Sequence, residues 1–123
     1  MVKKTKIRIN VIITNKTTKD RSNISCLGIK QDNKITYICD NIKNSIELLN
    51  NKIIIKRSSH NYQNIIDLNN TNGKSTITIP EGTIKLLLDT KKIIKKENYI
   101  KINYIVKETN EEYELIIEIG EII

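Results

Sequence analysis

His60, the only histidine of the chain, is the side chain best suited to act as a general base near neutral pH. It lies in the polar segment Ser58-Ser59-His60-Asn61, so either serine could serve as a nucleophile beside it. Such catalysis also needs a third group that orients the base. No spacing in the sequence fixes that group, and a histidine in a polar turn is usually solvated. We therefore predict that the protein is not an enzyme, and we assign no catalytic residue.

Other catalytic and cofactor chemistries find little support in the sequence. One histidine and two cysteines do not supply the four ligands of a structural zinc site. The glutamates near the C-terminus alternate with apolar residues, which places them on a solvent face and not across a cleft as a glycosidase needs. Gly73-Lys74-Ser75 resembles the end of a phosphate loop, but the first glycine of that motif would fall on Leu68. We predict no metal and no cofactor.

Arg57 is the polar residue that carries most information about a site. It has the strand phase of Ile53 and Ile55, so it faces the same interior as these apolar residues. A buried arginine is costly unless it is paired. One alternative is a structural partner at the mouth of a barrel, such as carbonyls, Asp67 or a tyrosine hydroxyl. The other is an anionic ligand, bound with the help of Tyr37 and Tyr104, which have the same inward phase. We predict Arg57, Tyr37 and Tyr104 as the ligand-binding residues.

The elements that position these residues are strands, because the dominant period of the sequence is two. Isoleucine, which favours strands, is abundant, and alanine, the best helix former, is absent. Only the stretch 43–49 is ambiguous and could hold a helical turn. Turn signals fall at short intervals between the alternating runs, at residues 31–33, 50–51, 69–73, 80–82 and 108–111. The alternating apolar residues are Ile7, Ile9, Val11, Ile13, Ile35, Tyr37, Cys39, Ile53, Ile55, Ile77, Ile79, Ile84, Leu86, Leu88, Ile100, Ile102, Tyr104, Val106, Tyr113, Leu115, Ile117 and Ile119.

This pattern predicts an all-β protein of one domain over residues 1–123, with about eight to ten strands and little helix. A sandwich has the same signature, but short turns between successive strands favour a single closed antiparallel up-and-down β-barrel. Several strands also carry apolar residues on the outward face, at Ile12, Ile54, Ile65, Leu87 and Ile116. We therefore expect that a partner, such as a second copy in a homodimer, covers part of the outer surface.

The chain resembles the YwiB-like proteins, a small bacterial family of unknown function. The resemblance depends on Arg57 at the end of the KIIIKRSS run, on Pro80 and Gly82 in TITIPEGTIKLLLDT, and on the INYIV strand with Tyr104. Two positions depart from the family pattern: Ser59 stands where the family often has glycine, and Glu81 where it often has an aromatic residue. The resemblance implies a calycin-like, that is lipocalin-like, barrel and implies no chemistry.

The net charge of +7 permits binding to nucleic acid, acidic ligands or another polyanion. Lysines are scattered along the chain, and only Lys91, Lys92, Lys95 and Lys96 cluster. At least three of the five tyrosines face inward by phase, so they do not form an outer stacking platform for single strands. Nucleic acid therefore remains an alternative partner that we do not favour.

The N-terminal segment MVKKTKIRIN alternates from the start and has no apolar core of a signal peptide, and no apolar run approaches the length of a membrane span. We predict a cytoplasmic protein without a membrane partner, whose Cys26 and Cys39 are free thiols; a disulfide between them is the alternative. The function that we predict is binding of a small or anionic ligand in the barrel. The alternatives are a basic module for nucleic acid and a protein-interaction domain.

Overall fold

Alternating apolar residues form ten strands and no helix in the computed structural model, which describes residues 4–122, with Glu121 described by its backbone alone. That part of the chain contains no helix with the length and apolar character that crossing a membrane requires. The strands are β1 (Lys4–Asn15), β2 (Arg21–Gln31), β3 (Lys34–Cys39), β4 (Ile42–Leu48), β5 (Lys52–Ser59), β6 (Tyr62–Asn69), β7 (Asn72–Ile79), β8 (Gly82–Lys96), β9 (Tyr99–Val106) and β10 (Glu111–Glu121).

Each strand pairs with its neighbours in sequence, and β1 pairs with β10, which closes the sheet into a barrel. All pairs are antiparallel, and the closing pair aligns Ile9 with Ile119. The predicted closed up-and-down barrel is confirmed. Closure is not uniform along the strands: residues 21–27 of β2 pair with β1 alone, and residues 82–87 of β8 pair with β7 alone.

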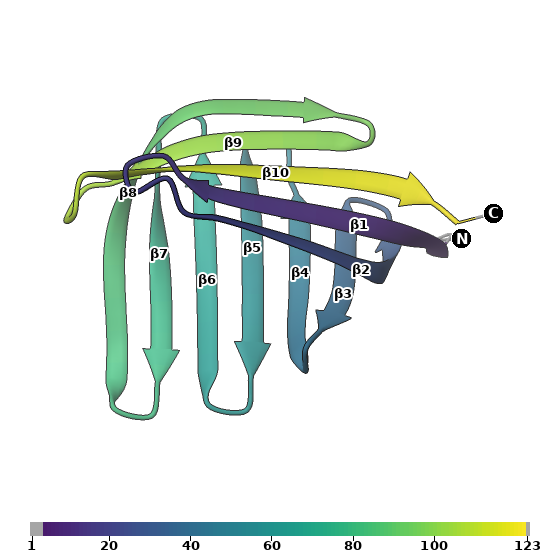
Figure 1. The fold of residues 1–123 in the computed structure, drawn as a ribbon, viewed down its shortest axis with the longest axis horizontal. Helices are drawn as coiled ribbons and strands as arrows, with labels where there is room; N and C mark the ends of the chain where they lie inside the picture. The colour runs from purple at the N-terminus through teal and green to yellow at the C-terminus, as the bar shows by residue number, and fades with distance from the viewer. Residues whose placement is uncertain (1–3, 123) are drawn as a thin grey trace.

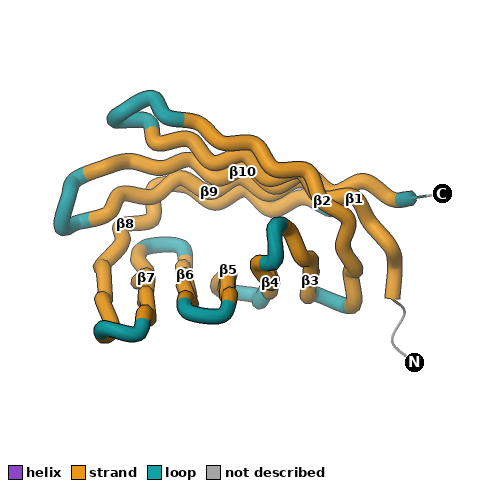
Figure 2. The backbone as a smooth tube through the Cα atoms, turned by 60° about the horizontal axis from the view of Figure 1, so that its bottom comes forward, coloured by secondary structure: helices purple, strands orange, loops and turns teal. Residues whose placement is uncertain are grey.

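The barrel is flattened into two layers whose strands cross steeply (Figure 1). One layer holds β3 to β7, and the other holds β9, β10, β1 and β2. The 15-residue strand β8 belongs to both, because it bends from the first layer into the second (Figure 2). Its pairing with β9 shifts register between Thr90 and Lys92, and this bulge supplies the bend.

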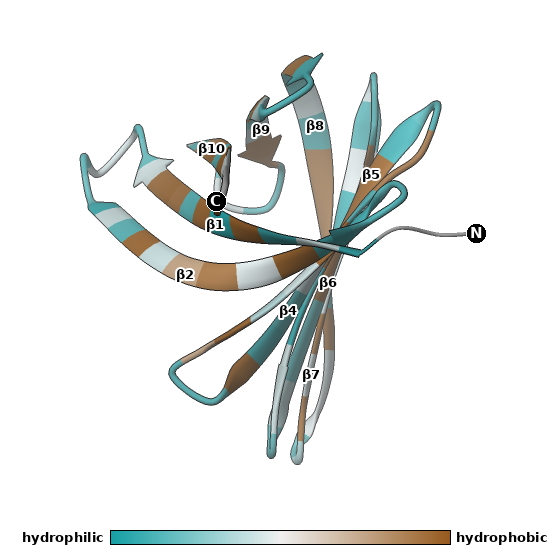
Figure 3. Ribbon diagram, turned by 90° about the vertical axis from the view of Figure 1, so that its right-hand side faces the viewer, coloured by the Kyte–Doolittle hydropathy of each residue, from teal (hydrophilic) through white to brown (hydrophobic). Residues whose placement is uncertain are grey.

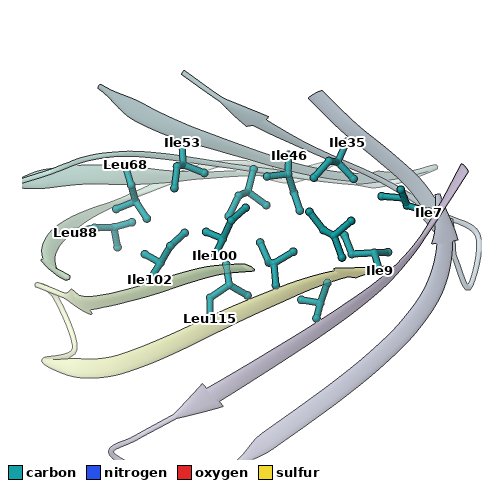
Figure 4. Close-up of a cluster of buried hydrophobic side chains, with 14 of the residues drawn as sticks. Ile7, Ile9, Ile35, Ile46, Ile53, Leu68, Leu88, Ile100, Ile102 and Leu115 are labelled. Atoms are coloured by element: carbon teal, nitrogen blue, oxygen red, sulfur yellow. The ribbon is translucent and has the colours of Figure 1, made fainter. Parts of the chain in front are cut away.

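Inward side chains from both layers meet in an apolar core (Figure 4). The alternation that predicted the strands is visible as brown and teal bands along β1 and β2 (Figure 3). The core lies toward one end of the barrel, which we call the closed end, where the turns after β2, β4, β6 and β8 gather. Its fully buried side chains are Ile7, Ile9, Ile35, Ile46, Ile53, Leu68, Leu88, Ile100, Ile102 and Ile117.

The ambiguous stretch 43–49 contains no helix: it belongs to β4 as far as Leu48, and a tight turn precedes that strand. Asp40 and Asn41 both have positive φ, 53° and 65°, as a two-residue type I′ hairpin turn requires. This turn was not predicted. The predicted Asn50-Asn51 turn is confirmed: the Leu49 amide donates to the Lys52 carbonyl at 2.9 Å. However, positive φ is not found at Asn50 or Asn51.

The expectation of free thiols is wrong. Cys26 and Cys39 form a disulfide and are not free thiols. They lie across from each other because they continue the register of the β2–β3 pair, in which Gly28 faces Tyr37. Ile84 keeps the alternating phase of Leu86 and Leu88, but it is 49% exposed near the turn of the β7–β8 hairpin.

Candidate ligand-binding cavity

The end of the barrel opposite the closed end, which we call the open end, contains a cavity of about 190 Å³. Arg57, Tyr37 and Tyr104 all line this cavity, although they come from β5, β3 and β9. The three residues nominated from the sequence are therefore brought together. Most of the wall is apolar, and its isoleucines, valine and leucine are Val11, Ile13, Ile24, Ile42, Ile46, Ile55, Ile66, Leu115 and Ile117.

Arg57 reaches the cavity because its strand keeps a regular phase. Ile53 and Ile55, two and four residues earlier, are 0% and 7% exposed, and Arg57 follows on the same face, half-buried. In register, Arg57 lies between Asn44 of β4 and Asn64 of β6. The predicted inward orientation of Arg57 is confirmed.

The guanidinium of Arg57 makes no ion pair within 4.0 Å and no hydrogen bond with the groups that the structure describes. Asp67, the carboxylate proposed as its partner, lies opposite Ile54 on the outer face and pairs with Lys52 at 3.6 Å. The structural pairing with Asp67 is therefore wrong.

The two asparagines beside Arg57 are already engaged with other groups. The Asn44 side-chain amide donates to the Ile42 carbonyl at 3.0 Å, and the Asn64 side-chain oxygen accepts from the Ser75 hydroxyl at 2.9 Å. These bonds engage one polar atom of each asparagine with a group other than Arg57, and Arg57 itself lines the cavity. Five N–H donors of a guanidinium match the oxygens of a carboxylate or phosphate.

Tyr37 stands near Arg57 because β2 carries a glycine opposite it. Gly28 pairs with Tyr37, and a Cβ at position 28 would lie 2.7 Å from the Thr36 carbonyl and 3.0 Å from the Tyr37 Cβ. Burial raises the pKa of the Tyr37 hydroxyl, and the positive charge of Arg57 partly opposes this rise. The phenol therefore remains a neutral hydrogen-bond donor in the field of the arginine.

Tyr104 and Tyr113 form a stacked pair on the opposite wall, with ring centroids 5.5 Å apart. They are register partners on β9 and β10, so the stack follows directly from the strand pairing. Burial, and to a smaller extent Tyr113, raises the pKa of Tyr104 to about 12. The pair offers a flat apolar wall and a neutral hydroxyl.

Asp40 lines the cavity at the open end, and His60, in the neighbouring turn, does not. Asp40, exposed in the β3–β4 turn, is the acidic residue among the described lining residues. His60 is exposed in the β5–β6 turn and is not part of the lining. The arrangement imagined from the sequence, with a serine and an orienting group around His60, is not formed. Within residues 4–122, no group of three or more His, Cys, Asp or Glu side chains is placed to hold a metal ion.

Sequence reasoning missed Asn44, Asn64 and Asp40 as residues of the cavity, and it read Tyr113 as inward without assigning it to a site. The strand phase of Asn64 could have been found from its pairing with Arg57 across the polar turn at 60–61. To place Asn44 from the sequence, the Asp40-Asn41 turn must be known, because that turn sets the register of β4 on β3.

Comparison with solved structures supports the barrel. The chain is similar to the YwiB protein from Bacillus subtilis, with a TM-score of 0.71 and 13% sequence identity over 99% of this chain and 94% of that chain. No protein-family model matches the sequence, and no curated protein matches it. At this identity the similarity establishes a shared fold and carries no activity.

Proposed function

We propose that the protein is a binding protein, and not an enzyme, that holds a small anionic ligand with an apolar body in the open end of its barrel. The observation that carries the proposal is Arg57, whose charged head borders a cavity and finds no ion-pairing partner among residues 4–122. A guanidinium in a half-buried apolar setting is costly without an anion. A ligand carboxylate or phosphate supplies that anion with bidentate geometry.

The size and lining of the cavity support the same ligand class. A cavity of about 150 Å³ is enough to hold benzene, so 190 Å³ suits a molecule the size of benzoate. The stacked Tyr104 and Tyr113 rings offer an apolar wall for its body. The neutral phenol of Tyr37, whose pKa burial raises further above 10.0, adds a hydrogen-bond donor to the cavity wall.

The fold similarity and the resemblance at Arg57, Pro80, Gly82 and Tyr104 also support a relationship with the YwiB-like proteins. We infer that the chain is a distant member of that family. This inference adds no ligand, since no activity accompanies the similarity.

The proposal is tested by titrating the isotope-labelled protein with benzoate and following amide signals by NMR. Benzyl alcohol, which has the same ring and no charge, is the matched ligand control. We expect benzoate to move signals of the cavity strands around Ile55, Ile66 and Ile117. Arg57→Ala should weaken binding by at least about tenfold, because a charge-assisted hydrogen bond contributes about 1.5–3 kcal/mol. Arg8→Ala, which removes an exposed arginine of β1, should change nothing.

Asp40→Asn sharpens the test, because it removes the negative charge at the mouth of the cavity. An anionic ligand should bind this variant as tightly as the wild type or more tightly. Equal binding of benzoate by wild type and Arg57→Ala would refute the proposal. Shifts confined to residues outside the cavity, or weaker anion binding by Asp40→Asn, would refute it as well.

A further inference from the structure

A second concave surface lies on the outside of the barrel, over the outward faces of β2 to β6. It is a groove of about 680 Å³. Among the described residues, six large apolar side chains are strongly exposed, and four of them line this groove: Leu27, Ile29, Ile38 and Ile122. Single exposed apolar residues are common on protein surfaces, but a concave cluster marks an interaction site.

The outward orientation of these side chains follows from the register. Leu27 and Ile29 flank Gly28, which pairs with the buried Ile7 of β1 and therefore lies on the inner face. Ile38 alternates with the inward Tyr37 in the same way. The groove and the Arg57 cavity thus lie on opposite faces of the same strands.

The groove is also cationic. Lys6, Lys34, Lys43 and Lys56 line it, and none of its described lining residues is acidic. Lysines elsewhere, at positions 16, 52, 101 and 107, pair with carboxylates. Among the described side chains, Lys43 and Lys56 have no such ion pair, so their charge is available to an anionic ligand; Lys34 lies opposite Glu47 in the β3–β4 register.

The strand register shows where the lysines and the apolar side chains lie along the groove. Lys43 pairs with Ser58 and Ser45 pairs with Lys56, so two ammonium groups and two hydroxyls form one outward patch on β4 and β5. Ile38 pairs with Lys43, so the apolar residues begin on the next strand, β3, and continue onto β2. The groove therefore has a cationic end over β4–β5 and an apolar end over β2–β3.

We propose that this outer groove binds an anionic amphiphile, with its acid group on the Lys43–Ser45–Lys56–Ser58 patch and its hydrocarbon chain along Ile38, Leu27 and Ile29. Three strand spacings separate β2 from β5, which is roughly 14 Å. That length suits a straight chain of about ten carbons, at about 1.3 Å of extended chain per carbon. The groove volume lies in the range of small-molecule sites.

The test is equilibrium binding of decanoate by isothermal titration below its micelle concentration. Decanol is the neutral control of the same chain length. We expect decanoate to bind more tightly than decanol and its affinity to fall with added salt. The double variant Lys43→Gln, Lys56→Gln should weaken decanoate binding by roughly five- to tenfold. Ile38→Ser should weaken both ligands.

Matched variants on the projecting β7–β8 hairpin, Lys85→Gln and Ile84→Ser, remove an exposed lysine and an exposed isoleucine outside the groove. They should leave decanoate binding unchanged. Arg57→Ala separates the two sites: it should weaken benzoate binding by at least about tenfold and retain decanoate binding. Loss of decanoate binding in Arg57→Ala would place the amphiphile inside the barrel and overturn the inference.

Equal affinity for decanol and decanoate, or no effect of the double lysine variant, would also overturn it. A second copy of the chain could occupy the groove in place of the amphiphile. If sedimentation shows a dimer that Ile38→Ser dissociates, and decanoate neither binds nor competes, the groove is a self-association surface and the proposal is wrong.

Discussion

The closed end and the open end of the barrel are built from the same inward positions of the same strands, yet they are filled in opposite ways. On β5, Ile53 is fully buried at the closed end, and Arg57, four residues later on the same face, borders a cavity at the open end. On β9, Ile100 and Ile102 are completely buried, and Tyr104 follows them in the stacked pair with Tyr113.

Hydrogen bonds between turns reinforce the closed end. The Leu48 amide donates to the Asn33 carbonyl at 2.8 Å, and the Lys95 ammonium donates to the Leu49 carbonyl at 2.9 Å. At the open end, Arg57 borders the cavity, and its guanidinium has no ion pair with the described side chains. The closed end is therefore the packed region of the barrel, and the open end holds the cavity to which we assign the proposed ligand.

The largest effect is expected at the closed end. Ile53→Ala should lower the free energy of unfolding by about 2–5 kcal/mol, because it removes apolar contacts and leaves a cavity in a packed core. Urea denaturation followed by circular dichroism measures this. Ile84→Ala, at a position that is 49% exposed, is the control and should change stability by under about 1 kcal/mol. A similar small loss for Ile53→Ala would mean that the closed end does not carry the stability.

The disulfide at the open end, where Cys39 borders the cavity, is expected to have the next largest effect. Cys26 and Cys39 are separated by 13 positions and join β2 to β3 where their ladder ends. A crosslink of this span stabilises by about 2–4 kcal/mol, mainly by restricting the unfolded chain. Urea unfolding of the wild type with and without a reductant should show this loss, and a Cys26→Ser, Cys39→Ser variant should be insensitive to the reductant.

Mass analysis of native protein treated with an alkylating agent checks the bond directly. Two labelled cysteines in protein prepared without reductant would contradict the disulfide. Because disulfides persist mainly in oxidising compartments, the same trapping on whole cells also tests the predicted cytoplasmic location.

Tyr104 should make the open end sensitive to alkaline pH. Its pKa rises from 10.0 to about 12 in the folded protein, so the folded state holds the phenolic proton more tightly than the unfolded chain does. This contribution is complete below pH 10 and is lost as the pH rises toward 12. The loss is at most about 3 kcal/mol. Tyr104→Phe should remove it, so the wild type should lose more stability than the variant between these pH values. Parallel pH profiles would contradict the assignment.

Strand phase explains how much of this site the sequence could predict. The regular alternation through Ile53 and Ile55 was enough to orient Arg57, and the alternation through Ile100 and Ile102 was enough to orient Tyr104. Strand phase shows which residues face inward. It does not show which of them become neighbours, because that depends on the register between strands and on how the two layers cross. Asn44 needed the Asp40-Asn41 turn, and the Cys26–Cys39 bond needed the register of β2 on β3.

The outer groove was beyond sequence reasoning for a related reason. The predicted outward apolar positions were Ile12, Ile54, Ile65, Leu87 and Ile116, and of these only Leu87 is strongly exposed in the described structure. The residues that line the groove are brought together by the curvature of β2 to β6 and not by their spacing within one strand. The curvature of a sheet depends on strand twist and on bulges, and the period-two alternation of apolar residues does not predict either of them.

The most direct test of the account is the stability of Arg57→Ala measured with and without benzoate. Without ligand, the variant should unfold within about 1 kcal/mol of the wild type, because Arg57 has no ion pair to lose within residues 4–122. At a benzoate concentration about tenfold above the dissociation constant, the wild type should gain about 1.4 kcal/mol and the variant should gain almost nothing. A loss of about 2–4 kcal/mol without ligand would make Arg57 a structural residue, and equal gains with benzoate would place the ligand elsewhere.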